Sequence, residues 1–360
     1  MDRTIRTGVV GFGLAGKVFH CPFVQAVPGL ELAAIVQRKG DEAAQAYPQA
    51  TIYRSLDDLL VSDVKLVVVG TPNATHYEFA KAAIQAGKHV VVDKPVTANS
   101  TEAAELADLA QKHGVLYAPF HNRRFDGDFL TAKSIIESGQ LGRIVWFESH
   151  FDRFRPIPRA NSWKEDAGDL QSLVLDLGPH LADQALALFG RPKFVTAHAR
   201  TEREGSAIED AFDIQLDFGG TQALLRASII CADPAPRFLI HGTGGSFRKY
   251  GLDPQEPAII NGAKVPPVGD DSWLTEDESQ WGTLSIAVDL THPAKIEKRA
   301  VPTVRGDYRN FYLNVRDTIL GKASLIVTPQ DATRTMRILE LARKSAHQKR
   351  TLPIEDKDWN

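Results

Sequence analysis

The first third of the chain alternates short apolar runs with segments in which apolar residues recur at helical spacing. The runs predicted as strands are TGVVGF, LAAIV, KLVVVG, KHVVVD and GVLYAPF, and helices are predicted over Ala15–Val27, Thr75–Ala86 and Thr101–Lys112. This alternation is typical of parallel strands joined by crossover helices. Nearly every unusual residue follows a strand, where an open doubly wound sheet binds its ligands.

The pattern changes after about residue 120. A helix near Leu130–Ser138 precedes VWFESHFDRF, and a long apolar helix ends at Gly190. The stretch AFDIQLDFGGTQALLRASI predicts a β-hairpin, with Phe212, Ile214, Leu216 and Phe218 on one face, Asp213, Gln215 and Asp217 on the other, and Gly219-Gly220 at the turn. Further strands are predicted at Arg237–Ile240, Thr283–Asp289 and Lys295–Val301, a last helix at Gln330–Ser345, and an excursion or lid from Asp253 to Gly282.

These patterns predict an α/β protein with two domains. Residues 1–121 are expected to form a Rossmann domain with a doubly wound parallel sheet, which binds a dinucleotide. Residues 122–360 are expected to form an α+β domain with a large, mostly antiparallel open sheet, which binds substrate and makes oligomer contacts. A length of 360 residues agrees with two domains of ordinary size.

Composition narrows the function classes. A formal net charge of -3 gives no global attraction for nucleic acid or acidic membranes, and no apolar run approaches the roughly 20 residues of a membrane-spanning helix. The opening MDRTIRTGVVGFG lacks the pattern of a secretory signal, so a cytoplasmic location is expected. Cys21 and Cys231 have no metal-binding context, and we expect no metal.

The sequence GFGLAG places Gly11, Gly13 and Gly16 at GxGxxG spacing, with Leu14 and Ala15 between them. Because a predicted strand precedes the loop and a helix follows it, the pattern indicates a turn that brings backbone close to a pyrophosphate. The alternative is a purely structural glycine turn.

The end of the second strand bears on the choice of cofactor. An NAD-selective chain places a carboxylate there to hold the ribose 2′-hydroxyl, whereas this chain has Gln37-Arg38-Lys39. An Arg binds a 2′-phosphate that a carboxylate would repel, so NADP is predicted, with weaker use of NAD possible. The alternative is that Arg38 and Lys39 form a solvated turn.

In HVVVDKPVTA, a strand of buried character breaks at once into Asp93-Lys94-Pro95. A surface salt bridge followed by a turn would account for these residues. The functional alternative is that Lys94, at the carboxyl end of a strand, faces a reacting oxygen and stabilises the alkoxide that develops there.

A second cluster of chemically active residues lies in LVLDLGPHLADQALALFG, where Asp176 stands four residues before His180. His180 is a candidate for proton exchange with a substrate hydroxyl, with Asp176 orienting it or binding substrate. The structural alternative is a capping histidine and a carboxylate at a helix N-terminus, and Pro179 leaves the local geometry open.

The segment from Phe151 to Trp163 interleaves bases with aromatic residues, namely Arg153, Arg155 and Arg159 with Phe154 and Trp163. Such a loop can stack on a sugar or cyclitol, and a solvated loop is the alternative. The acidic net charge and the lack of an RNA-binding motif argue against nucleic acid.

Five motifs in order make the whole chain resemble the Gfo/Idh/MocA family of sugar and cyclitol dehydrogenases. They are VGFGLAG, TPNATH (71–76), DKP (93–95), HNRRFD (121–126) and DLGPHLADQ (176–184). HNRRFD, FDRFRP, DDSW and the closing helix most resemble the NADP-dependent scyllo-inositol dehydrogenases of that family.

The resemblance implies roles for individual residues. Lys94 is the implied catalytic lysine, and Asp176 and His180 complete the catalytic set. The residues implied at the cofactor are Gly11, Gly13, Leu14, Ala15, Gly16, Gln37, Arg38, Thr71, Pro72, Asn73, His76, Asp93 and Lys94, and those implied at the substrate are Asn122, Arg123, Arg153, Trp163, Asp176 and His180. Asp93 departs from the Glu that the family usually has, which is one methylene longer.

The sequence thus predicts an NADP(H)-dependent oxidoreductase that interconverts a secondary alcohol of an inositol or related polyol with its ketone. An aldose 1-dehydrogenase or a sugar-nucleotide reductase is an alternative enzyme. A non-catalytic, NADP-sensing regulatory protein is an alternative of another class. The resemblance also implies a homodimer or homotetramer formed through the C-terminal sheet.

Overall fold

The structure is a computed structural model that describes residues 4–159, 162, 165–166, 168, 171–291 and 294–359. The chain forms two compact units. The first comprises Met1–Phe125, Pro254–Leu274 and Asp307–Thr333, and the second comprises Asp126–Asp253, Thr275–Gly306 and Arg334–Asn360. The predicted domains therefore differ from these units over 122–125, 254–274 and 307–333, all of which belong to the first unit.

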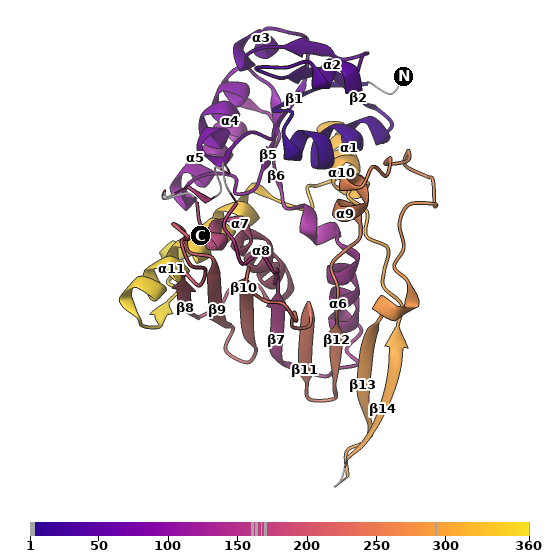
Figure 1. Ribbon diagram of the computed structural model, residues 1–360, viewed down its shortest axis with the longest axis vertical. Helices are drawn as coiled ribbons and strands as arrows, with labels where there is room; N and C mark the ends of the chain where they lie inside the picture. Colours follow the sequence, from indigo (N-terminus) through magenta and orange to yellow (C-terminus); the bar gives the residue numbers. More distant parts are fainter. Residues whose placement is uncertain are drawn as a thin grey trace. The chain divides into compact units, whose positions relative to one another are not determined.

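The first unit contains a six-stranded parallel sheet (Figure 1). In chain order its strands are β1 (Ile5–Val10), β2 (Leu30–Val36), β3 (Thr51–Tyr53), β4 (Leu66–Val69), β5 (His89–Asp93) and β6 (Tyr117–Phe120), and their order in the sheet is β3-β2-β1-β4-β5-β6. This order reverses direction between β1 and β4, which is the switch point of a doubly wound fold. The predicted Rossmann sheet is confirmed.

Short helices cover this sheet. They are η1 (Gly16–His20), α1 (Cys21–Ala26), α2 (Glu42–Ala46), α3 (Leu56–Leu60), η2 (Asn73–Thr75), α4 (His76–Gln85), α5 (Ser100–His113), η3 (Asn122–Phe125), α9 (Gln255–Ile260) and α10 (Arg309–Ile319). The predicted helix over Ala15–Val27 is interrupted, because Gly16–His20 forms a π-helix in which the Cys21 N–H donates to the Gly16 carbonyl. The predictions missed α10, whose Phe311, Tyr312 and Val315 are buried.

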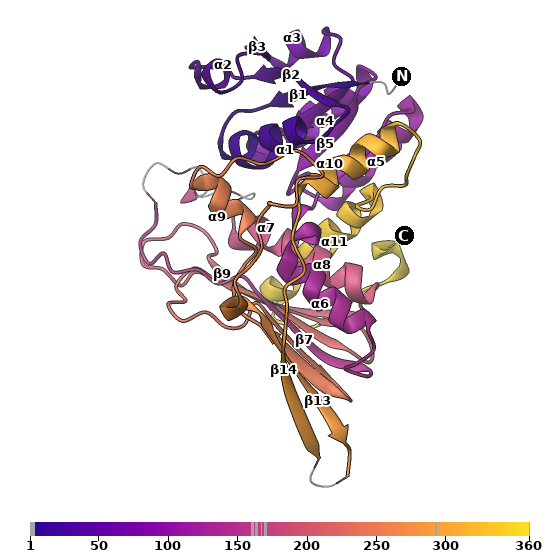
Figure 2. The same ribbon diagram turned by 90° about the vertical axis from the view of Figure 1, so that its right-hand side faces the viewer.

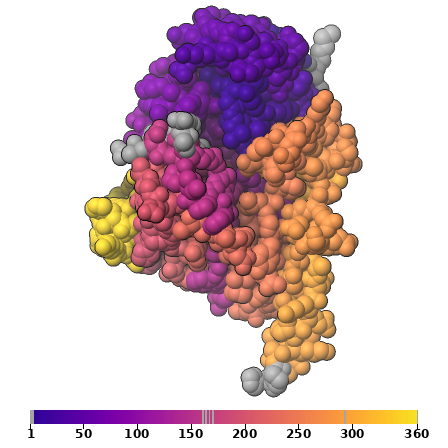
Figure 3. All heavy atoms as spheres, in the orientation of Figure 1, coloured from indigo at the N-terminus to yellow at the C-terminus, as the bar shows by residue number. Residues whose placement is uncertain are grey.

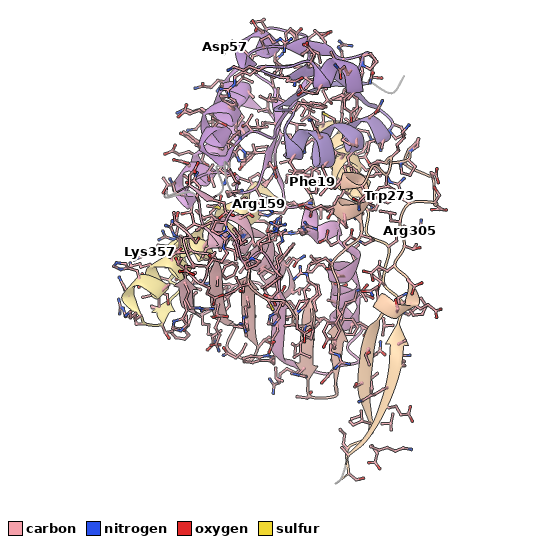
Figure 4. All side chains as sticks on the ribbon, in the orientation of Figure 1. Phe19, Asp57, Arg159, Trp273, Arg305 and Lys357 are labelled. Atoms are coloured by element: carbon pink, nitrogen blue, oxygen red, sulfur yellow. The ribbon has the colours of Figure 1, made fainter. Side chains whose placement is uncertain are left out.

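The segment predicted as an excursion or lid is packed into the first unit. Trp273 is 3% exposed and its Nε1 donates to the Gln255 side chain, which also accepts from the Tyr308 N–H. Figure 4 labels Trp273, which lies in the hydrophobic core of this unit, and Phe19, which is partly buried and packs against that core. An indole with a satisfied N–H is a large apolar group to bury, and it holds residues 254–274 in place.

The second unit is built on a nine-stranded sheet with the order β14-β13-β12-β11-β7-β10-β9-β8-β15. Its strands are β7 (Ile144–His150), β8 (Phe194–Arg200), β9 (Ala211–Asp217), β10 (Gln222–Ser228), β11 (Phe238–Gly242), β12 (Gly245–Lys249), β13 (Gly282–Asp289), β14 (Lys295–Val301) and β15 (Leu352–Pro353). Only the β7–β10 pair is parallel among these described strands. The predicted large, mostly antiparallel sheet is confirmed.

Helices pack on one face of the second sheet, as Figure 2 shows for α6 and α8. The helical segments are α6 (Gly127–Glu137), α7 (Leu173–Asp176), α8 (Gly178–Phe189), α11 (Pro329–Gln348, from Arg334 in this unit), η5 (Glu278–Gln280) and η6 (Asp356–Asp358). The long helix predicted to end at Gly190 is broken at Leu177. Figure 3 shows the hairpin of β13 and β14 standing out from the rest of this unit.

The predicted β-hairpin is β9 and β10, joined through Gly219-Gly220. Phe212, Ile214 and Leu216 are buried and Phe218, the last residue predicted on their face, is half-buried, whereas Asp213, Gln215 and Asp217 lie on the other face and are not buried. Gly219 has a φ of 85°, a conformation in which a side chain would be strained. The alternation of apolar and polar residues therefore assigned the faces of this hairpin correctly.

Candidate active site

The glycine loop after β1 has the geometry of a phosphate-binding turn. Gly11 has a φ of 101°, and a Cβ atom there would lie 2.7 Å from the Gly70 carbonyl oxygen. A Cβ on Gly16 would overlap the Gly11 carbonyl, whereas a Cβ on Gly13 would have no protein atom within 4 Å. Two glycines therefore allow close packing of the protein's own backbone, and Gly13 keeps a surface open.

That contrast fits a dinucleotide. In the Rossmann fingerprint the first glycine makes the tight turn, the second lets backbone approach the pyrophosphate, and the third lets helix and strand pack closely. Gly11, Gly13 and Gly16 match these three requirements in order. Gly13 and Leu14 are exposed and Ala15 is half-buried. Three consecutive residues of the turn are therefore accessible to a ligand.

The loop after β2 is held by side chains that leave Arg38 exposed. Arg54 donates to the carbonyls of Gln37 (3.1 Å) and Gly40 (2.7 Å) and pairs with Asp41. The Gln37 side chain accepts from the Ala43 N–H and donates to Glu42. The buried Gln37 side chain thus stabilises the conformation of this loop, while the Arg38 side chain is accessible to a ligand.

The loops after β4 and β5 are joined by His76, which is 1% exposed. Its Nε2 lies 2.7 Å from the Thr71 carbonyl and its Nδ1 lies 2.7 Å from the Pro95 carbonyl. Thr71 also pairs its hydroxyl with that of Thr75. The imidazole therefore fixes the spacing of the two loops that carry Thr71-Pro72-Asn73 and Lys94-Pro95, of which Pro72 is exposed and Asn73 half-buried.

Asp93 and Lys94 lie at the carboxyl end of β5, and both are half-buried. The Asp93 Oδ1 accepts the Lys94 N–H at 2.7 Å, and its Oδ2 lies 3.7 Å from His20 Nε2. Burial raises the pKa of the Asp93 carboxyl, but interactions with His20, Lys94 and His76 outweigh it and leave this pKa below its usual value. Asp93 is therefore an anion beside the lysine.

Asn122 and Arg123 lie in η3, and both are buried. The Arg123 guanidinium donates to Glu256 and to the Tyr308 hydroxyl, at 3.1 Å for the latter. These contacts join η3 to the two C-terminal segments that return to the first unit. Their role toward substrate stays a prediction.

In the second unit, Asp176 ends α7 and His180 lies in the first turn of α8. Leu177 separates the two helices, and its carbonyl accepts the N–H of His180. Pro179 stands at the start of α8, where its missing N–H costs nothing. Asp176 and His180 are therefore on two short helices rather than one continuous face.

His180 is 4% exposed, and its ring stacks on Phe151 with centroids 6.4 Å apart at 24°. The guanidinium groups of Arg153 and Arg237 lie over the same phenyl ring, at 5.0 and 5.5 Å from its centroid. Arg237 also donates to Gln184, one turn beyond His180 in α8. Arg153 is thus brought near His180, whereas Trp163 lies outside the described residues.

The sequence predictions missed several residues around the predicted site. Arg54 and Arg237 gave no local signal, because each acts through contacts with residues distant in the sequence, and Phe151 was noted only as part of the FDRFRP loop. His20 and Tyr312 likewise belong to no motif that was singled out. No group of three or more His, Cys, Asp or Glu side chains within the described parts of the chain has the arrangement of a metal site, and no described helix is long and apolar enough to cross a membrane.

Comparison with known proteins identifies the family to which this chain belongs. The model of an oxidoreductase family with an NAD-binding Rossmann fold matches residues 5–121, and that of the GFO/IDH/MocA C-terminal domain matches residues 129–248. The chain belongs to the Gfo/Idh/MocA family. It is an NAD(P)-dependent oxidoreductase of that family, and the resemblance inferred from the five motifs is confirmed.

Relatives of this family match over the full length of the chain. The chain is 37% identical to scyllo-inositol 2-dehydrogenase (NADP(+)) of Bacillus subtilis, covering 98% of this chain and 96% of that protein. It is 39% identical to an uncharacterized oxidoreductase of Schizosaccharomyces pombe, covering 98% and 99%. A solved structure of an oxidoreductase from Bacillus cereus has a TM-score of 0.88 at 34% identity, covering 98% and 99%.

Proposed function

We propose that this Gfo/Idh/MocA protein is an NADP(H)-dependent dehydrogenase that interconverts a secondary alcohol of an inositol, or a related sugar or polyol, with its ketone. The observation that carries the proposal is the full-length similarity to an NADP-dependent scyllo-inositol 2-dehydrogenase. Lys94, Asp176 and His180 stand at the positions that the family motifs give to catalytic residues. The proposal thus has two levels, the dehydrogenase activity and, more specifically, the identity of the polyol substrate.

The preference for NADP rests on the loop after β2. This strand ends without the carboxylate that would hold a ribose 2′-hydroxyl, and Arg38 is exposed there. Asp41 and Glu42 are acidic neighbours, but Arg54 and Gln37 respectively engage them. The Arg38 guanidinium is then the group that favours a 2′-phosphate through charge-assisted hydrogen bonds.

A bound nicotinamide ring supplies the hydride acceptor of the oxidation. The residues that would hold the cofactor are the glycine turn (Gly11–Gly16), Arg38, the 71–76 loop and Asp93. Lys94, an ammonium group at the carboxyl end of β5, stabilises negative charge as it develops on the substrate oxygen. His180 takes the hydroxyl proton in oxidation and returns it in reduction, and Asp176 orients the substrate or His180.

The surroundings of His180 support its role in proton transfer. Stacking on Phe151 holds the ring plane, and Arg237 fixes the following turn of α8 through Gln184. A ring with few accessible orientations is pre-organised for transfer to one oxygen. Arg153, whose guanidinium lies 5.0 Å from the centroid of the same Phe151 ring, is a cation suited to bind polyol hydroxyl groups.

We also propose that the protein is a homodimer or homotetramer formed through the second sheet. The face of that sheet opposite the helices carries Leu224 and Leu239, neither of which is buried although their strand neighbours are. Glu148 of β7 lies between them in the register. A mixed apolar and polar sheet face of this kind is suited to contact a second copy.

A panel of substrates tests the function. Purified protein is assayed with scyllo-inositol, myo-inositol, aldoses and sugar nucleotides, each with NADP and NAD. Turnover of an inositol with NADP and a higher kcat/KM than with any aldose is expected. Faster turnover of an aldose or sugar nucleotide would replace the substrate assignment, and NADPH binding without turnover of any member would favour the regulatory alternative.

A further inference from the structure

Lys17 is an exposed cation beside the glycine turn, and the proposed chemistry assigns it no role. It is the second residue of η1, and its backbone N–H donates to the Gly13 carbonyl at 3.0 Å. Its side chain folds back over the turn, because the Lys17 Nζ lies over the Phe12 ring, 5.3 Å from the ring centroid. The ammonium group therefore lies beside the turn that carries Gly13.

The Phe12 ring links this turn to the loop after β2. It is 9% exposed and packs edge-on against Tyr47, with centroids 5.9 Å apart at 88°. Tyr47 directly follows α2, the short helix at the end of that loop. A cation over an aromatic face is attracted to it. Through Phe12, the Lys17 ammonium group and α2 are thus brought to the same small region.

The charge of Lys17 also acts on an acidic group of that loop. Interactions with its own backbone N–H and with the Gln37 side chain, together with the charge of Lys17, hold the pKa of Glu42 below its usual value. The ring contact and this attraction both put the Lys17 ammonium group between the glycine turn and the loop that carries Arg38. All of these residues belong to the first unit.

A dinucleotide bound to a Rossmann sheet passes through this region. Its pyrophosphate lies at the glycine turn, and its adenosine ribose reaches the end of the second strand, where the 2′ substituent is recognised. In NADP that substituent is a phosphate monoester, which carries a charge of about −1.5 to −2 at pH 7. A single guanidinium does not balance this charge, so a second cation at this point strengthens binding.

We propose that Lys17 is a specificity-determining residue that binds the 2′-phosphate of NADP together with Arg38. Arg38 supplies a planar fork for two phosphate oxygens, whereas Lys17 supplies a compact charge from the side of the glycine turn. The inference rests on the proposed preference for NADP. It adds a residue outside the strand end at which the two cofactors are usually distinguished.

Lys17 also offsets a charge that opposes this ligand. Glu42 is exposed, and its carboxylate would repel a 2′-phosphate. The attraction between Lys17 and Glu42 reduces this repulsion. The structural alternative is that Lys17 is only a surface partner of Glu42, and exposed pairs of this kind contribute little to stability. The two interpretations differ in what removal of the Lys17 charge does to cofactor binding.

Lys17→Met tests the proposal, because it removes the charge and keeps an unbranched apolar side chain over Phe12. We expect this variant to bind NADPH and 2′,5′-ADP about fivefold or more weakly, and NADH and ADP less than about twofold more weakly, because only the first two ligands carry the 2′-phosphate. Fluorescence titration measures the reduced cofactors, and competition with NADPH measures the adenosine nucleotides.

Two further variants serve as controls. Lys17→Arg keeps the charge and should bind all four ligands within about twofold of the wild-type protein. Lys65→Met removes an exposed lysine just before β4, at the edge of the sheet opposite to the one where the strands present their ligands, and should change nothing. Thermal melts of each variant establish that a change in binding is not a loss of folded protein.

Equal losses for NADPH and NADH in Lys17→Met would overturn the inference, because they would assign Lys17 to the pyrophosphate or to the conformation of the turn. Unchanged affinity for NADPH and 2′,5′-ADP would also overturn it and leave Lys17 as a surface partner of Glu42.

The adenosine nucleotides separate failure of this inference from failure of the proposed function. Binding of 2′,5′-ADP requires neither hydride transfer nor a polyol, so a selective loss of it in Lys17→Met supports the role of Lys17 even if no substrate in the panel is turned over. Tighter binding of NADH than of NADPH by the wild-type protein would overturn the proposed cofactor preference. A selective loss in Arg38→Ala without one in Lys17→Met would overturn this inference alone.

Discussion

Asp93 and Lys94 are adjacent in the sequence, yet their neighbours give them different tasks. The Asp93 carboxylate accepts the backbone N–H of Lys94 and lies 3.7 Å from His20 Nε2, and Lys94 follows it at the end of β5. Arg38 and Gln37 are also adjacent, and only Gln37 is engaged by the loop beneath it. At the scale of residues, therefore, the fold holds Gln37 inside its loop and leaves the adjacent Arg38 exposed.

Lys94→Ala tests the lysine directly. Because its charge is needed chiefly as negative charge forms on the substrate oxygen, kcat should fall about 100-fold or more while NADPH affinity stays within about threefold. Steady-state kinetics and fluorescence titration measure the two quantities, and Lys112→Ala, at an exposed helix position, is the control. Near-normal turnover in Lys94→Ala would return Asp93-Lys94-Pro95 to its structural interpretation.

Arg38→Ala tests cofactor selection. Charge-assisted hydrogen bonds to a 2′-phosphate contribute about 1.5–3 kcal/mol, so NADPH affinity should fall roughly 10- to 100-fold. NADH, which lacks the phosphate, should bind almost as before. Titration of both reduced cofactors decides the matter, since equal losses would mean that Arg38 stacks on adenine without contacting the phosphate.

Asp93→Asn tests the ionic state of this carboxyl group through stability. Its pKa is lowered in the folded protein, so the ionised form contributes stability above its unfolded pKa of about 3.9, and this contribution is lost as pH falls through the lower folded value. The difference in unfolding free energy between wild type and Asp93→Asn should be constant above about pH 5 and shrink below about pH 4. Urea unfolding at several pH values measures it, and a difference that does not change with pH would contradict an ionised Asp93.

At the scale of elements, the glycine turn and the π-helix after it form one structural piece. Gly16 begins the π-helix and His20 ends it, and Cys21 is the first residue of α1. π-helical turns are rare and often occur at functional sites. Here the turn begins at the glycine that packs against Gly11 and ends at the imidazole that faces Asp93.

Two alanine substitutions separate the two kinds of glycine in this turn. Gly13→Ala should leave the melting temperature within about 2 °C of wild type, because no protein atom lies near the added methyl group, yet it should weaken NADPH binding about tenfold or more. Gly16→Ala should instead destabilise the protein by about 2 kcal/mol or more, because its methyl overlaps the Gly11 carbonyl. Thermal melts and NADPH titration of both proteins measure this, and unchanged binding in Gly13→Ala would remove the turn from the cofactor site.

At the scale of the whole molecule, two units share one chain that passes between them repeatedly. Residues 254–274 and 307–333 complete the core of the first unit through Trp273, Tyr308 and Tyr312. The second unit keeps one sheet face covered by helices and the other free of them in the described part of the chain. The proposed oligomer uses that second face.

The oligomer prediction concerns this sheet face. We expect light scattering after size exclusion to give the mass of a dimer or tetramer for the wild-type protein, and the double variant Leu224→Glu, Leu239→Glu to shift toward monomer, because buried unpaired charges oppose association. Val61→Glu changes an equally apolar residue that is 89% exposed on the first unit, and should have no effect. A monomeric wild type, or a double variant of unchanged mass, would contradict an interface on this face.

Local patterns in the sequence determined much of this protein, because they record interactions between residues close in the chain. Alternating apolar residues predicted β9 and β10 with their faces, and glycine spacing after β1 predicted the turn at Gly11–Gly16. The Lys94, Asp176 and His180 positions came from motifs, and their joint role stays a prediction. The same reasoning placed Arg38 at the end of β2.

The tertiary structure alone decided what depends on contacts between distant segments. No local pattern indicates that residues 254–274 and 307–333 return to the first unit, since their apolar residues bury against a core formed some 200 residues earlier. The same holds for Tyr312 against His20, and for Arg237 against Phe151 and Gln184. Such pairs are selected by the shape and polarity of the space that the folded chain leaves, and that space exists only once the strands and helices have assembled.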